Sequence, residues 1–164
     1  MPGDPETPTG GYVYDARLIA ASGGALSPLG LPSGFPFPSN RELAAAATAL
    51  SSAAGPVIVD GLAFGAMPAA LIRALPRKPL ALCHHPLAHE PGLDAATAAR
   101  LRETEREALA LAAHVIVTSA ATKRTLATEF ALPEAKITVA PPGLDRAAAA
   151  RGVGEEGVER RRER

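Results

Sequence analysis

Four short runs of apolar, mostly β-branched residues recur along the chain, at 57–59, 80–83, 115–117 and 137–139. None of them alternates with polar positions, which is typical of strands that are covered on both faces. The segments between them repeat apolar residues at helical spacing. Strands that alternate with helices predict an α/β fold, here a Rossmann-like parallel sheet with helices on both faces.

Local signals place the helices. Ser39 and Glu42 form a capping box, and Ser119 is the expected cap of the last helix. A further helix is expected to begin near Tyr12. The helix after Asp94 has one apolar stripe, and we expect its charged residues to form a solvated surface. Together the patterns predict helices over 41–53, 68–75, 94–113 and 121–130.

Two regions interrupt the alternation. Four prolines between Leu26 and Ser39 argue against a regular inner strand there. The leader 1–9 has no apolar run, so we expect the sheet to lack its first strand. We therefore predict one Rossmann-like domain over 1–145, incomplete at its start, and a charged tail over 146–164 that is disordered.

Composition narrows the class of protein. The chain has 164 residues, with 17 basic and 17 acidic side chains and 4% aromatic residues, a balance that disfavours nucleic acid as a partner. A single cysteine, Cys83, which we expect to be a buried hydrophobe, fits a reducing cytoplasm. No apolar run is long enough to span a bilayer, although peripheral contact with a membrane stays compatible with the sequence.

Three of the four histidines follow directly after the strand 80–83. Ligands of parallel α/β sheets bind at the carboxyl ends of the strands, so this cluster lies where such a fold places its chemistry. The cluster could ligate a metal, hydrogen-bond a polar ligand, or satisfy loop carbonyls. Pro86 and the missing H-E-x-x-H register argue against the metal, and we expect none. The residues concerned are His84, His85, His89 and Glu90.

Other candidate positions also follow strands or precede a helix. Gly10 and Gly11 would let backbone amides approach a phosphate at a helix N-terminus, or would simply form a turn. Neither a dinucleotide fingerprint nor a P-loop is present. Asp60 ends the first strand and could bind hydroxyl groups of a ligand, although the glycines after it could equally just turn the chain. His114 stands at the entry of a strand, which indicates a structural role.

Taken in order, six segments resemble the N-terminal, acceptor-side domain of glycosyltransferase family 4, whose members have the GT-B fold. The segments are TPTGGYVYDARLI, GFPFPS, VIVDGLAFGAMP, LALCHHPLAHEPGLD, EREALALAAHVIVTSAATKRTL and ITVAPPGLD. The resemblance implies transfer of a sugar from a nucleotide-sugar donor to a hydroxyl acceptor, usually with retention and with no required metal or cofactor. It implies that Gly10 and Gly11 approach the donor diphosphate and that His84 is the catalytic residue at the donor sugar. The substrate-binding residues would be Asp60, His85, His89 and Glu90.

The chain also departs from the family. Its first strand is not evident, and the sequence ends soon after the segment that resembles the exit into a second domain. From this we expect a fragment with little or no transferase activity by itself. Two other classes stay open, namely a non-catalytic α/β ligand-binding module and a metal-dependent hydrolase.

Overall fold

The sheet consists of four parallel strands in the computed structural model, which describes residues 10–143. The strands are β1 (Ile58–Asp60), β2 (Leu80–Cys83), β3 (His114–Val117) and β4 (Ile137–Val139), and they are hydrogen-bonded in that order. Val59 pairs with Ala81, Ala81 with Val115, and Val115 with Ile137. The four strands predicted from the sequence are confirmed, and all four end at one edge of the sheet.

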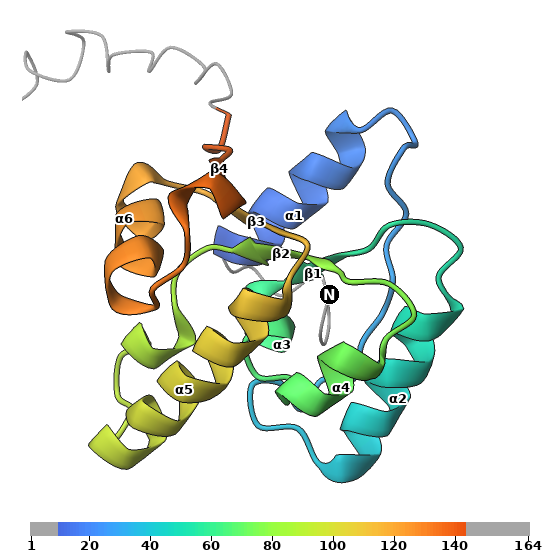
Figure 1. Cartoon of the computed structure of the whole chain (residues 1–164). Helices are drawn as coiled ribbons and strands as arrows, with labels where there is room; N and C mark the ends of the chain where they lie inside the picture. The colour runs from blue at the N-terminus through green and yellow to red at the C-terminus, as the bar shows by residue number, and fades with distance from the viewer. Residues whose placement is uncertain (1–9, 144–164) are drawn as a thin grey trace, which may run out of the picture.

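Helices cover both faces of this sheet. Figure 1 shows α1 (Gly10–Ala21) on one side, and α3 (Gly61–Phe64), α4 (Ala69–Ala74) and α5 (Ala95–Leu111) on the other. The remaining elements are α2 (Asn40–Ser52), η1 (Leu87–His89), α6 (Ala120–Glu129) and η2 (Glu134–Lys136). The predicted α/β fold is thus confirmed. Two details differ: α1 begins at Gly10 rather than near Tyr12, and residues 61–64 form a helical turn where we expected only a loop.

Side-chain caps explain where the longer helices begin. The Ser39 amide donates to Glu42 Oε2 at 2.8 Å and the Glu42 amide donates to Ser39 Oγ at 3.3 Å, which confirms the capping box. Asp94 accepts from the Thr97 amide at the start of α5, and Ser119 accepts from the Thr122 amide at the start of α6. Each cap satisfies an amide that the first helical turn leaves without an intrahelical partner.

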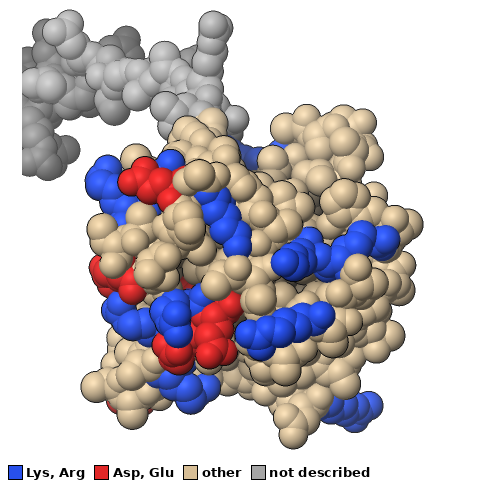
Figure 2. Space-filling view, in the orientation of Figure 1, with Lys and Arg blue, Asp and Glu red and all other residues tan. Residues whose placement is uncertain are grey.

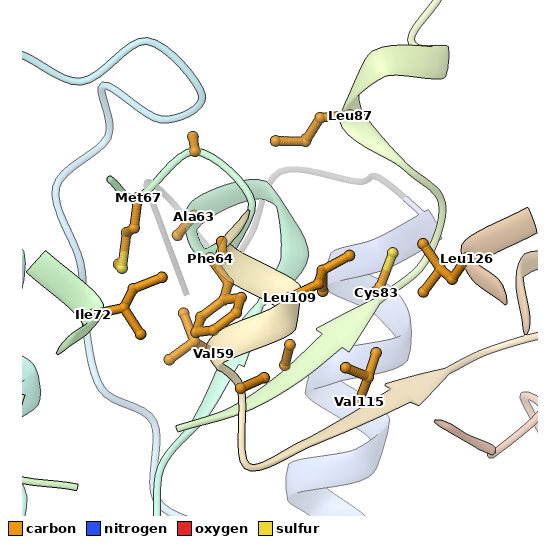
Figure 3. Packing of buried hydrophobic residues seen from close by; sticks show 14 of the residues in the cluster. Val59, Ala63, Phe64, Met67, Ile72, Cys83, Leu87, Leu109, Val115 and Leu126 are labelled. Carbon is orange, nitrogen blue, oxygen red and sulfur yellow. The ribbon is translucent and has the colours of Figure 1, made fainter. Parts of the chain in front are cut away.

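The core lies between the sheet and the helices α3 to α5. In Figure 3, Phe64, Leu109 and Val59 pack together, with Cys83 and Val115 nearby on the sheet. Cys83 is fully buried, as expected, and burial raises the pKa of its thiol. Apolar burial of this kind supplies the main driving force that holds the helices against the strands.

The proline-rich segment forms no regular strand. Leu31 makes only an isolated bridge, while Leu31 and Phe35 are buried and anchor the loop to the core. Between residues 10 and 143 no strand precedes β1. The prediction that the leader 1–9 contributes no first strand concerns residues outside this range. The tail 146–164, for which we predicted disorder, and the leader 1–9 both lie outside the described residues.

Charged side chains are distributed unevenly over the surface. Figure 2 shows acidic and basic side chains intermixed in the region of α5, while another part of the same face has basic groups only. On α5, Arg106 pairs with the exposed Glu103 at 2.6 Å, which confirms the solvated charged face. Within residues 10–143, no helix has the length and apolar content needed to cross a bilayer.

Candidate functional site

A pocket of about 540 Å³ opens at the carboxyl edge of the sheet. Its walls come from the first turn of α1 and from the segments that follow β1, β2 and β3. All the residues predicted for the site except His89 line it, namely Gly10, Gly11, Asp60, His84, His85 and Glu90. The volume lies within the range of small-molecule sites.

The imidazole of His84 packs directly against the start of α1. A Cβ atom added to Gly11 would lie 3.2 Å from Cδ2 of His84, closer than a side chain there comfortably allows. Gly10, by contrast, has open space around it. The glycines thus form the first helical turn, where backbone amides have no intrahelical acceptor, and His84 lies beside that turn.

Two buried carboxylates hold the same ring. Nε2 of His84 lies 3.2 Å from Oδ1 of Asp15 and 3.5 Å from Oδ2 of Asp60. Burial of the ring lowers the pKa of His84, but hydrogen bonds and charge from Asp15 and Asp60 outweigh this and raise the pKa from 6.5 to about 9. His84 is therefore an imidazolium at neutral pH.

Short-range structure positions each member of this trio. Asp15 lies one helical turn after Gly11 on α1, which brings its carboxylate to the same face. Asp60 ends β1 and accepts from the Leu62 amide at 2.9 Å, so it also caps α3. His84 follows β2, and its carbonyl accepts from Thr122 Oγ1 at 3.1 Å.

Tyr14 fixes α1 over the pocket. Its ring meets His84 edge-on at 5.3 Å between centroids, and its hydroxyl donates to the Ala140 carbonyl at 2.9 Å. Burial, followed by the charge of Asp15, raises the pKa of Tyr14. The helix that carries Gly11 and Asp15 is thus tied to the segment after β4, on the far side of the pocket.

The contacts of the His84 ring with the two carboxylates both run through Nε2. Both nitrogens of an imidazolium carry a proton, so Nδ1 is a second donor. His84 is one of the residues that line the pocket, and it therefore brings a charged N–H group to this end of the sheet.

The remaining predicted residues have other surroundings. His85 pairs with Glu90 at 2.7 Å on the exposed rim of the pocket. The short η1 turn places His89 outside the pocket, where its Nε2 pairs with Glu129 at 3.0 Å. His114 contacts Thr138 Oγ1 at 2.8 Å at the opposite end of the strands, in agreement with a structural role.

The metal set considered from the sequence is not brought together, because His85 and His89 have separate carboxylate partners. A different trio, Asp15, Asp60 and His84, offers three ligand atoms within 4.8 Å of one another, so this group has the donors to hold a cation. However, an imidazolium between two carboxylates already satisfies all three groups without one.

A second cavity, of about 440 Å³, runs along the outer edge of β1. Its lining is largely apolar and includes Leu18 and Ile19 of α1 and residues 57–60. Asp15 and Asp60 line this cavity as well as the pocket. We assign the functional site to the pocket, because the polar strand-end groups converge there.

The fold and the pocket together define a Rossmann-like domain with a pocket at the carboxyl edge of its sheet. Comparison with known proteins narrows this class: residues 8–148 match the family described as Glycosyltransferase Family 4. The chain therefore belongs to glycosyltransferase family 4. No curated protein and no solved structure matches the chain.

The sequence reasoning missed two buried acids. Asp15 shares a helix face with Leu18 and Ile19, three and four residues later, which signals an inward position. Glu105 follows Leu101 by four residues and is only 1% exposed, so it lies in the apolar stripe of α5. An acid within a buried stripe was the available signal in both cases.

Proposed function

We propose that the protein takes part in transfer of a glycosyl unit from a nucleotide-sugar donor to a hydroxyl acceptor, with retention at the anomeric carbon as is usual in the family. Membership of the family supports glycosyl transfer in general. The observation that supports the detailed proposal is the contact between His84 and Gly11, since it joins a polar donor to a helix N-terminus in one pocket. The proposal includes a cytoplasmic location, in line with the single cysteine.

The donor phosphates would lie at the start of α1. Amides of Gly10 and Gly11 and the positive end of the helix dipole attract an anion, by about 0.3–1 kcal/mol for the dipole. The two carboxylates beside His84 offset its positive charge. The backbone amides, rather than the imidazolium, are therefore the groups that bind phosphate.

His84 would contact the donor sugar through Nδ1. With a pKa of about 9 the ring is protonated at neutral pH, so it donates a hydrogen bond and is not a general base. A sugar hydroxyl or ring oxygen is the matching acceptor. Asp60, His85 and Glu90 would contribute further polar contacts around the sugar or the acceptor.

The resemblance to the family implies that the described residues supply one side of the donor cleft. A donor held from one side stays largely in water, whereas small-molecule sites normally bury most of their ligand. We therefore expect the 164-residue chain alone to bind a donor with a dissociation constant of about 1 mM or weaker.

Protein-observed NMR with UDP-glucose and GDP-mannose tests the proposal on the 15N-labelled chain. We expect weak shift changes at Gly10, Gly11 and His84, and weaker binding in His84→Ala, because this substitution removes the contact with the sugar. His114→Ala is the matched control, because it removes an imidazole from the opposite end of the strands and should leave binding unchanged. Shift changes that gather at that opposite end, or binding that survives His84→Ala unaltered, would refute the assignment.

A further inference from the structure

The turn that carries His84 is fixed at two points. At its start, the His84 carbonyl accepts from Thr122 Oγ1 at 3.1 Å and from Thr118 Oγ1 at 3.4 Å. Three residues later, the Leu87 amide donates to Oε2 of Glu105 at 2.9 Å. The backbone between these anchors contains Pro86, whose ring restricts its own φ.

Glu105 reaches this turn from inside the protein. It lies in the middle of α5, is 1% exposed, and faces away from the charged surface of that helix. A Cβ atom added to Gly65 would lie 3.1 Å from both Cγ and Oε1 of Glu105. The carboxyl group therefore lies against the segment after β1 as well as the segment after β2.

A carboxyl group buried in an apolar core is energetically unfavourable. Burying it costs free energy unless hydrogen bonds compensate, whereas a leucine would simply fill the space. Among residues 10–143, the hydrogen-bond donors to Glu105 are the backbone amides of Leu87 and Ala88. Unlike an apolar side chain, the carboxyl group of Glu105 therefore holds the turn after β2 in a fixed position.

We infer that Glu105 is a positioning residue for His84, because its carboxyl group fixes the turn after β2 and so directs the imidazole into the pocket. This inference rests on the proposed function only where ligand binding is concerned. Anchors at both ends leave the short segment His84–Leu87 little freedom to rotate. Loss of the inner anchor would let His84 leave Asp15 and Gly11.

The charged and titratable groups around Glu105 give the inference a spectroscopic signature. Burial raises the pKa of Glu105 to about 8, against the amide donors of Leu87 and Ala88 and the charge of Arg102, all of which lower it. Other titratable groups close to this turn include Cys83, whose thiol is kept neutral by burial over this range, and His84, whose pKa is about 9. The Leu87 amide should therefore report ionisation of Glu105.

The test uses the 15N-labelled chain with Glu105→Gln and Glu105→Leu. In the wild type, the Leu87 amide shift should titrate with a midpoint near 8, and both variants should lose this midpoint and keep only the influence of His84 near 9. Glu105→Gln keeps one acceptor oxygen and should preserve the His84 ring signals. Glu105→Leu should speed hydrogen exchange of the Leu87 amide about tenfold and move the His84 signals, while Val115 stays protected. Glu107→Gln, an exposed acid of the same helix, should change neither readout.

Binding of UDP-glucose, which carries the sugar that His84 would contact, separates this inference from the proposed function. We expect Glu105→Leu to weaken UDP-glucose binding about tenfold and Glu105→Gln to rescue it to within about twofold. If UDP-glucose fails to bind the wild type while the His84 signals still depend on residue 105, the positioning role stands and the proposed ligand is wrong. If the His84 signals and UDP-glucose binding are the same in Glu105→Leu as in the wild type, the inference is overturned.

Discussion

Asp15→Asn is the sharpest test of the charge state assigned to His84. The substitution keeps the shape of the side chain and removes its charge at 3.2 Å from Nε2. Asp60, at 3.5 Å, remains as the second partner. Because Asp15 is the largest of the influences that raise the pKa of His84, we expect the pKa to fall from about 9 by about one to two in the variant.

The same change has a consequence for stability. A rise from 6.5 to about 9 corresponds to about 3 kcal/mol of extra stability, since each pKa unit is worth about 1.4 kcal/mol. The folded state has the higher pKa, so this contribution is fully present below pH 6.5 and is lost as the pH rises through 9. Asp15→Asn should remove about 1–3 kcal/mol of it at pH 6.

Two assays measure these quantities. NMR titration of the four histidines should find one ring in the wild type with a midpoint near 9, assigned through His84→Ala. Urea unfolding at pH 6 and pH 9 should show a smaller pH dependence in Asp15→Asn than in the wild type. Asp94→Asn, the same change at an exposed helix cap, should leave the His84 midpoint unchanged. A wild type in which all four histidines titrate between about 6 and 7 would refute the reasoning.

Three further outcomes follow from the structure. Burial raises the pKa of Glu105 from 4.5 to about 8, so the free energy of unfolding should fall as the pH rises between these values. This fall in the free energy of unfolding is at most about 5 kcal/mol, and Glu105→Gln should abolish it in urea titrations at pH 5 and pH 8. The same change with pH in the wild type and the variant would contradict this. Gly61→Ala should destabilise the chain by about 1–3 kcal/mol in thermal or urea unfolding, since its Cβ would lie 3.1 Å from the Leu82 carbonyl oxygen, and an unchanged midpoint would count against this packing. Ser39→Ala should cost about 1 kcal/mol through loss of the cap of α2, with an unchanged urea m-value; a neutral result would mean that the capping box adds no stability.

Local patterns were sufficient to predict the frame of the molecule. Short apolar runs located the strands, because a strand covered on both faces needs apolar residues at nearly every position. The strand β4 departs from this, since its central residue, Thr138, is polar and exposed. Ser39 and Glu42 predicted the start of α2, since a capping box is formed by residues three apart in the sequence. The placement of His84 at the carboxyl edge then followed from the parallel arrangement alone.

Contacts between distant segments could not be predicted in this way. Asp15 meets His84 across 69 positions of sequence, and no local pattern encodes such a distance. The local pattern alone did not separate the three histidines, although the family resemblance pointed to His84. The η1 turn directs His89 towards Glu129 and leaves His84 at the pocket. The position of Glu105 was in principle visible, because it keeps the helical spacing of Leu101, yet its partner amide on Leu87 was not.

The cavity beside β1 makes the trio of Asp15, Asp60 and His84 sensitive to what occupies it. Both carboxylates line that cavity as well as the pocket, whereas His84 lines only the pocket. A molecule seated along β1 would therefore lie against the carboxylates without touching the imidazole. A cationic group there would compete with His84 for the two carboxylates and let the ring lose its proton at a lower pH.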